Sequence, residues 1–584
     1  MILQALNGYY RRMAEEGDAG ISPEGFEKKE IPFVVVLNRQ GECVGLLDTR
    51  EGEEKKKQAR SFTVPKGVKK ASGIAANLLW DTANYVLGIP KPDPKKEPEQ
   101  LAEKAREQQR SFIDLIRERL PIKDEGVQSV LSWLESGHLS LLASYPVWEE
   151  ISQTAPLVTF QLEGETCLIC QREAVRSAIL GDTGRGNQPG EYQSCLVTGE
   201  QDIPARLHTA IKGVWGAQSS GANIVSFNLD AFRSFGKEQG QNAPVGKRAE
   251  FGYTTAINKM LAKGSRQRLQ VGDCSAVFWA ERKNLLEDVF ADVFGESTKE
   301  NPDQQIAAVR ELYKAPESGA PPLDEDLTPF YVLGLAPNAA RISVRFWYPG
   351  TVGEAARHIK QHFEDCAIVH GPKQPEYLSL FRLLVSTAAL GDAKYIPPKL
   401  AGDVMKAILV GIPYPRTLFA AVVNRIRAEQ SKRDQNGKSV QNITYPRAAL
   451  IKALLVRESR YYKRTEMEVS MALDVRNNNP GYRLGRLFAV LEKIQEEASP
   501  RINATIRDRF YGAASSTPVA AYPHLMKLKN HHLAKLENRG RAVNLEKVIG
   551  EIMDGLDDFP THLSLQDQGR FAVGYYHQRQ DFFK

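Results

Sequence analysis

The feature that most constrains the fold is a change of sequence pattern near residue 354. From there to the C-terminus, apolar and charged residues alternate with the 3.6-residue period of helices, and β-branched runs are rare. The segment 483–498 is the clearest case, because its apolar side chains fall on one helical face. We therefore expect this part of the chain to be helical throughout.

The residues before 354 mix strand and helix patterns. A β-branched run, a turn at 38–41 and a second run predict a hairpin over 32–50. Further strands are expected at 157–164, at 273–280 and in two runs between 330 and 350. Helices are expected at 1–20, 72–87, 128–142 and 283–313, and a charged helix is expected to follow the three prolines that open the stretch from 91 and to end at Leu120. The predicted fold class is α+β, with small antiparallel sheets in a mixed N-terminal portion and an all-helical C-terminal bundle.

A chain of 584 residues is long enough for two to four domains. The pattern changes suggest a mixed α/β region at 1–330, a β-rich connector at 331–370, a helical region at 371–466 and a helical bundle at 467–584. The N-terminus lacks the basic and apolar regions of a signal peptide, and no apolar stretch approaches a membrane span. Six irregularly spaced cysteines suggest reduced thiols and a cytoplasmic protein.

The stretch 211–257 is rich in glycine and polar residues. Glycine lets a backbone approach a ligand closely, while Ser, Asn and Gln supply hydroxyl and amide contacts. The candidate contacts to nucleic acid here are Lys212, Gln218, Ser219, Ser220, Gly221, Asn223, Lys247 and Arg248. An ordinary loop that covers a hydrophobic core is the alternative interpretation.

Basic residues elsewhere point to the same kind of ligand. Lys66, Lys69 and Lys70 precede Ser72 and Asn77, so cations stand beside a tight turn and an amide. Arg341 and Arg345 are expected on one face of a strand. Among the last helices, Arg507 and Arg509 add positive charge. Such contacts to phosphates would make binding fall steeply with salt.

Two sets of residues would suit a metal. Cys167, Cys170, Cys195 and His208 could form a zinc site, although the second pair lacks the short spacing of a zinc finger. His358, His362, Asp365 and His370 lie close in sequence, so a metal-dependent nuclease is an alternative function. No phosphate-binding loop or HExxH motif occurs. We therefore predict no metal, no cofactor and no catalytic residue.

Several long strings resemble the large subunit of the type I-C CRISPR interference complex, the type I-C Cascade (Csd1 family). They are VPKGVKKASGIAANLLWDTANYVLGI, CLVTGEQDIPARLHTAIKGVWGAQSSGANIVSFNLDAFRSFGKEQGQNAPV, FYVLGLAPNAARISVRFWYPG, INATIRDRFYGAASSTPVAAYPHLMKLKNHHLAKL and GRFAVGYYHQRQDFF. The similarity extends in order over most of the chain and is weaker at 91–150 and 281–325.

This resemblance implies a non-catalytic subunit near the 5′ handle of the guide RNA. Such a subunit reads the short protospacer-adjacent motif (PAM) in double-stranded target DNA, helps to start R-loop formation and holds the displaced single strand. The implied partners are the guide RNA, the target DNA, the backbone, handle-binding and small subunits, and a helicase-nuclease, with no membrane. A structural RNA-capping subunit without PAM readout is a further alternative.

The resemblance also implies that the C-terminal helices are made separately. In type I-C systems the small subunit typically arises from an internal start within the large-subunit gene. We therefore expect a short polypeptide from Met467 to Lys584, with Met471 as the alternative start.

Overall fold

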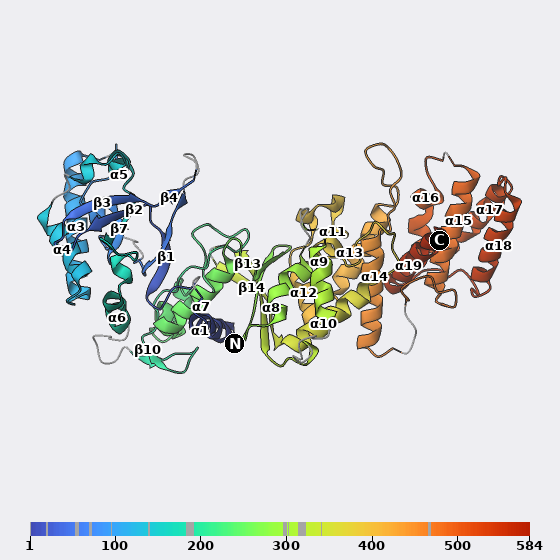
Figure 1. Ribbon diagram of the computed structural model, residues 1–584. Coiled ribbons are helices and arrows are strands. Elements are labelled where there is room, and N and C mark those ends of the chain that lie inside the picture. Colours follow the sequence, from blue (N-terminus) through green and yellow to red (C-terminus); the bar gives the residue numbers. More distant parts are fainter. Residues whose placement is uncertain are drawn as a thin grey trace. The chain divides into compact units, whose positions relative to one another are not determined.

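The computed structural model describes residues 2–18, 21–52, 58–68, 73–94, 96–137, 141–182, 192–295, 301, 303–313, 323–339, 341–464, 469–500 and 502–583. Apart from the first two residues, the chain divides into two compact units (Figure 1). Unit 1 contains Leu3–Thr209 and Val225–Ala256, and unit 2 contains Ala210–Ile224 and Ile257–Lys584. The loop 211–223 therefore belongs to unit 2 although it is flanked in sequence by unit 1.

Unit 1 is built around a four-stranded sheet in the order β3-β2-β8-β7. The strands are β2 (Phe33–Leu37), β3 (Cys43–Asp48), β7 (Trp80–Thr82) and β8 (Leu157–Leu162). β2 and β3 form the predicted hairpin, and β2, an inner strand between β3 and β8, is almost wholly buried. β2 and β8 pair in parallel, while the remaining pairs are antiparallel.

The helices around this sheet include α3 (Pro98–Arg119), which ends next to the predicted end at Leu120, and α4 (Glu125–Ser136), which begins three residues before the predicted range 128–142 and ends six residues before its end. The prediction of a helix over 72–87 is wrong, because only α2 (Ala83–Val86) is helical there. Trp80–Thr82 instead pairs with β8, and Leu79 has a positive φ of 63° that a helix does not accept. Long-range strand pairing thus overrides the local apolar pattern.

The other elements of unit 1 are shorter or lie outside the sheet. α1 (Ile2–Glu15) buries Leu6, Tyr9 and Met13 on one face, as its periodicity predicts. The remaining elements are β1 (Phe26–Glu30) paired with β6 (Ser61–Pro65), β4 (Arg50–Glu51) with β5 (Gln58–Ala59), β9 (Gln193–Ser194) with β10 (Gln201–Asp202), and the helices α5 (Trp148–Thr154), α6 (Glu173–Asp182) and α7 (Lys247–Leu261), whose last turn belongs to unit 2.

Unit 2 begins with a second four-stranded sheet, antiparallel throughout, in the order β11-β12-β13-β14. Its strands are β11 (Arg268–Val271), β12 (Cys274–Ala280), β13 (Pro329–Asn338) and β14 (Arg341–Thr351). One face, with Ala276, Phe278 and Phe346, packs into the main hydrophobic core. The sheet includes strands on both sides of residue 330.

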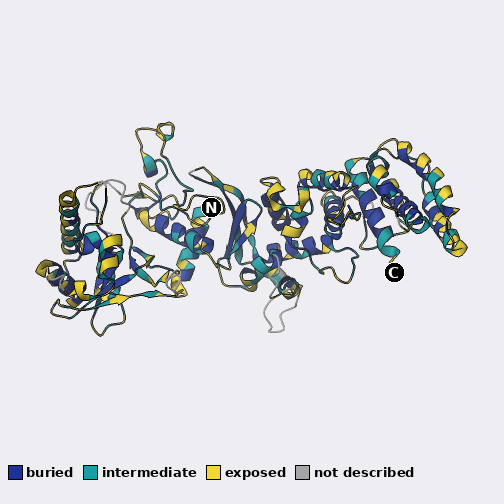
Figure 2. Cartoon of the chain, turned by 90° about the horizontal axis from the view of Figure 1, so that it is seen from above, coloured by how far each residue is buried: buried dark blue, intermediate teal, exposed yellow. Residues whose placement is uncertain are grey.

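The rest of unit 2 is helical, which confirms the prediction for this half. The helices are α8 (Leu285–Phe294), α9 (Gln304–Tyr313), α10 (Val352–Cys366), α11 (Leu380–Val385), α12 (Leu400–Val410), α13 (Arg416–Ala428), α14 (Tyr445–Tyr461), α15 (Pro480–Ala498), α16 (Ile506–Ser516), α17 (Pro518–Leu533), α18 (Arg539–Met553) and α19 (Leu565–Asp581). In Figure 2, buried residues line the inner sides of these helices and exposed residues the outer sides.

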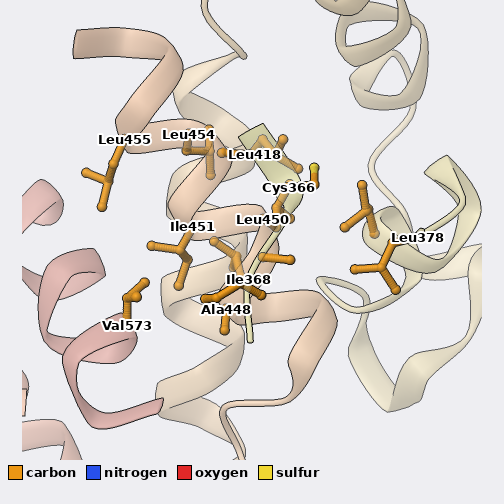
Figure 3. Packing of buried hydrophobic residues seen from close by; sticks show 14 of the residues in the cluster. Cys366, Ile368, Leu378, Leu418, Ala448, Leu450, Ile451, Leu454, Leu455 and Val573 are labelled. Atoms are coloured by element: carbon orange, nitrogen blue, oxygen red, sulfur yellow. The ribbon is translucent and has the colours of Figure 1, made fainter. Parts of the chain in front are cut away.

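A single hydrophobic core extends through the helices of unit 2. Figure 3 shows Ile451 and Leu454 of α14 in the same cluster as Leu418 of α13 and Val573 of α19. α19 therefore packs on α14 as well as on α15. The helices before and after residues 465–468 share this core.

Candidate nucleic-acid interface

The loop 211–223 is held at three places in unit 2. Its ends meet at Ile211 and Ala222, whose backbone groups exchange hydrogen bonds of 2.8 and 2.9 Å. The N–H of Lys212 donates to Oδ1 of Asn258 on α7 (2.8 Å). The N–H of Trp215 donates to Oγ of Ser275 on β12 (3.0 Å). These anchors fix the loop on a helix and on the sheet, so that its polar side chains are presented from a rigid base.

The course of this loop depends on two of its glycines. Gly213 and Gly221 have φ values of 85° and 87°, a conformation that L-residues rarely adopt. A Cβ at Gly213 would lie 2.6 Å from the carbonyl oxygen of Leu261. A Cβ at Gly221 would lie 2.8 Å from the carbonyl oxygen of Ile211. Both positions therefore require glycine for backbone geometry and for close packing.

The tip of the loop, defined here as residues 218–220, is exposed. Gln218, Ser219 and Ser220 are all exposed, and Trp215 is 62% exposed. Amides and hydroxyls can bond to phosphate oxygens or to base edges, and an indole can stack on a base or a sugar. The predicted contacts Lys212 and Gln218–Gly221 thus lie together on one loop.

Of the two predicted strand arginines, Arg341 lies beside this loop and Arg345 does not share its surroundings. Asn223 forms a parallel bridge with Arg341, and its carbonyl oxygen accepts the N–H of Ile342 (3.1 Å). A register shift leaves Arg345 as an extra residue between the pairs Leu335–Val344 and Gly334–Phe346. The expected alternation of the two arginines is therefore broken, and Arg345 bonds instead to Asp273 (3.0 Å).

The remaining predicted cations of the N-terminal half lie in unit 1. Lys66 contacts Glu250 (3.3 Å) and lies 5.3 Å from the ring centre of Phe251. Lys247 and Arg248 are exposed in the first turn of α7, and the backbone N–H of Arg248 donates to Asp202 (3.0 Å). Lys69, Lys70 and Ser72 lie outside the described residues.

Asn77 has a structural position. Its side chain is buried, and its Oδ1 accepts the N–H of Val68 (2.9 Å). Its own N–H donates to Oδ2 of Asp81 (2.8 Å). The interpretation of Asn77 as a base contact is therefore corrected, because its amide oxygen orders the turn that follows Lys66.

The two arginines predicted in the last helices have different surroundings. Arg507 is 2% exposed, lies 3.9 Å from Glu492 and bonds to the hydroxyl of Ser439. Its prediction as a phosphate contact is corrected, because the guanidinium is enclosed by α15 and by the loop before α14. Arg509, two residues later on α16, is exposed.

Among the histidines of the nuclease alternative, His362 is buried in the core, whereas His358 and His370 are half-buried. His362 is 1% exposed, and its Nδ1 lies 2.6 Å from the hydroxyl of Tyr414. Burial, together with the charge of Arg457, lowers the pKa of His362 to about 3. Asp365 is buried and forms ion pairs with Arg457 (3.6 Å) and Arg460. These groups connect α10 to α14 and to the segment between α12 and α13.

The four residues of the zinc alternative have separate surroundings. The thiol of Cys167 lies 3.7 Å from a carboxylate oxygen of Glu165. Cys170 is fully buried, and burial raises its pKa to about 12. The sulfur of Cys195 accepts the N–H of Gly246 (3.2 Å), and Nδ1 of His208 lies 2.5 Å from the hydroxyl of Tyr253. Within the described part of the chain, no three His, Cys, Asp or Glu side chains gather as metal ligands would.

Two residues that position the loop were not identified from the sequence. Asn258 lies inside an ordinary helical pattern, and Ser275 lies inside a buried strand. Ser275 could have been recognised as a polar residue in an otherwise apolar strand, because a buried hydroxyl needs a hydrogen-bond partner. Nothing in the helix pattern distinguishes Asn258.

Comparison with known families supplies the identification. A family model described as CRISPR-associated protein (Cas_Csd1) matches residues 6–583. The chain belongs to this family. A comparison with curated proteins gave no match.

Membership of the Cas_Csd1 family makes the chain a CRISPR-associated protein and implies a role in a CRISPR complex with other Cas subunits. It also confirms the resemblance found in the sequence, over nearly the whole length. Among the described helices of this Cas_Csd1 protein, none is both long and apolar enough to cross a membrane.

Proposed function

We propose that this Cas_Csd1 protein is the non-catalytic large subunit of a type I-C CRISPR effector complex, and that it recognises the PAM in double-stranded target DNA. The observation that carries the proposal is the loop 211–223, which presents exposed amide and hydroxyl groups from a rigid base. A subunit that reads only a few base pairs needs a small rigid contact of this kind, because guide pairing supplies most of the sequence information.

The side chains of the loop suit weak recognition of a few base pairs. Lys212 and Arg341 would contact phosphates and set the register, while Gln218, Ser219 and Ser220 would reach base edges. Lys66, Lys247, Arg248 and the undescribed Lys69 and Lys70 would add phosphate contacts. Because backbone contacts carry little sequence information, replacing the tip should change discrimination more than affinity for DNA in general.

The remaining parts of the proposal concern the assembly. The subunit would help to start strand separation, hold the displaced strand and the 5′ handle of the guide RNA, contact the backbone, handle-binding and small subunits, and recruit the helicase-nuclease in the cytoplasm. The helices from Met467 or Met471 onward would also be made as a separate small subunit. Met467 lies outside the described residues, and Met471 is exposed.

The proposal is tested by a triple variant of the loop tip, Q218A/S219A/S220A. Complexes reconstituted with this variant or with the wild type are incubated with a matched target beside a randomised flank, and the bound duplexes are sequenced. We expect the wild type to select a short motif and the variant to lose about tenfold of that selection, since one good base contact is worth ~1–3 kcal/mol.

The matched control is S431A/Q435A/N436A, which removes three exposed polar side chains from another loop of unit 2. This control should select the same motif as the wild type. If the tip variant also selects that motif with undiminished strength, the loop does not read DNA and the proposal fails for this site.

A further inference from the structure

Two adjacent exposed tyrosines stand at the C-terminal end of α14 in unit 2. Tyr461 is the last residue of the helix and Tyr462 follows it, with 52% and 60% of their surfaces exposed. Their ring centroids are 5.2 Å apart and their planes are nearly perpendicular. Burying an aromatic ring away from water is favourable, and exposed rings forgo this gain. An adjacent pair of exposed rings is therefore a candidate contact surface.

Two cationic residues, Lys463 and Arg464, follow this tyrosine pair in the sequence. The guanidinium of Arg464 lies 5.8 Å from the ring centre of Tyr462 and 3.4 Å from the carboxylate of Glu458. Lys463, between Tyr462 and Arg464, is exposed and has no carboxylate partner among the residues that the structure describes. Aromatic faces beside lysine and arginine match the bases and phosphates of a single strand, whose bases are free to stack.

The backbone after the helix adds an independent observation. The N–H of Arg464 donates to the carbonyl of Ser459 (3.0 Å), and the N–H of Lys463 donates to that of Arg460 (3.2 Å). These two bonds form a Schellman motif, in which the residue at the position of Lys463 is usually glycine. Lys463 instead adopts a φ of 51°, a strained conformation for a side-chain-bearing residue. Such conformations persist where the surrounding structure fixes them, and they cluster at functional sites.

We propose that Tyr461, Tyr462 and Lys463 form a binding platform for single-stranded nucleic acid. The bases stack on the two rings, and the phosphates contact Lys463 and Arg464. This proposal does not depend on PAM readout by the loop 211–223. Its test uses the full chain alone with single strands, whereas the test of the loop uses the assembled complex with duplex DNA.

The test measures binding of the full-length chain to labelled oligothymidine and oligouridine by fluorescence anisotropy. Y461A/Y462A should weaken binding about tenfold to a hundredfold, because base stacking on an aromatic residue carries that much affinity. Y461F/Y462F should bind like the wild type, since phenylalanine keeps the ring faces. The two oligomers separate DNA from RNA as the source of the strand.

The matched control is Y395A. Tyr395 is also exposed and has Lys394 4.9 Å from its ring centre, but it is a single ring and Lys394 is paired with Asp392 (2.9 Å). Y395A should bind both oligomers like the wild type. Equal binding by Y461A/Y462A and the wild type, or an equal loss in Y395A, would overturn the platform.

Lys463→Gly separates a role in binding from a role in folding. Glycine relieves the positive φ, so the midpoint of thermal unfolding should rise, while loss of the ammonium should weaken binding and lower the logarithmic salt slope by about 0.7. A variant that is more stable and binds equally well would remove Lys463 from the platform. A variant that is less stable would refute the strain on which the argument depends.

Discussion

The glycines between α15 and α19 offer a sharp test of the packing in unit 2. A Cβ at Gly485 would lie 2.0 Å from the carbonyl oxygen of Phe571, and one at Gly574 would lie 2.1 Å from that of Tyr482. Ordinary contact begins at 3.4 Å, so Gly485→Ala requires the two backbones to separate by about 1.4 Å (3.4 − 2.0). Neither side of this contact is a flexible side chain that could move away.

The expected cost follows from this geometry. Overpacking a well-packed core costs ~1–3 kcal/mol, and a backbone contact lies at the upper end, so G485A should lower the free energy of unfolding by about 3 kcal/mol. Gly550 on α18 is the matched control, because it is exposed and a Cβ there meets no atom within 4 Å. G550A should stabilise the chain by ~0.5–1 kcal/mol, since alanine is the better helix former.

Urea unfolding followed by far-UV circular dichroism gives the change for the whole chain. Amide hydrogen exchange in α15 and α19 shows whether the loss is local to their crossing. Equal stability of G485A and the wild type, or equal losses in G485A and G550A, would refute the inference that the two backbones are in contact.

Two further predictions concern buried charge. Arg507→Ala should cost about 3 kcal/mol of unfolding free energy, because it removes a buried guanidinium together with its contacts to Asp508 and Ser439, although Glu492 keeps its ion pair with Arg579 (2.8 Å). Arg509→Ala should stay within about 0.5 kcal/mol, because Arg509 is exposed. Similar losses in the two variants would contradict this difference in burial. The pKa of His362 is about 3 in the folded chain, against an ordinary value of 6.5. Below pH 6.5 the unfolded chain therefore binds a proton at this histidine, whereas the folded chain does not. Stability should therefore fall between pH 6.5 and 3, by ~2 kcal/mol at pH 5. His362→Gln should remove this part of the acid sensitivity in urea titrations, and an unchanged pH profile would show that His362 is not the group responsible.

Much of the fold could be predicted because local patterns and long-range packing agree. The β-branched run at 33–37 and the turn after it specify the β2–β3 hairpin, and the periodicity after residue 354 specifies helices. The agreement fails at 80–82, where a segment with a helix-like pattern pairs with β8, some eighty residues later. No property of a short window reports such a pairing.

The candidate site was predictable in composition and not in geometry. The glycines and polar residues of 211–223 signalled a loop with close backbone contacts, and Gly213 and Gly221 have the positive φ that this implies. The register shift at Arg345 and the burial of Arg507 were not predictable, because each depends on neighbours from distant segments such as Leu335 or Glu492. Charge alone does not distinguish a buried arginine from an exposed one.

The central claim is that this subunit gives the complex its dependence on the PAM. The most direct measurement compares binding of the guide-RNA complex, with and without the subunit, to matched duplexes that carry the selected or a scrambled flank, across a salt series. The account predicts flank-dependent binding only when the subunit is present, with a salt slope that counts its phosphate contacts. Equal binding to both duplexes in the presence of the subunit would contradict it and leave the chain a structural or recruiting role.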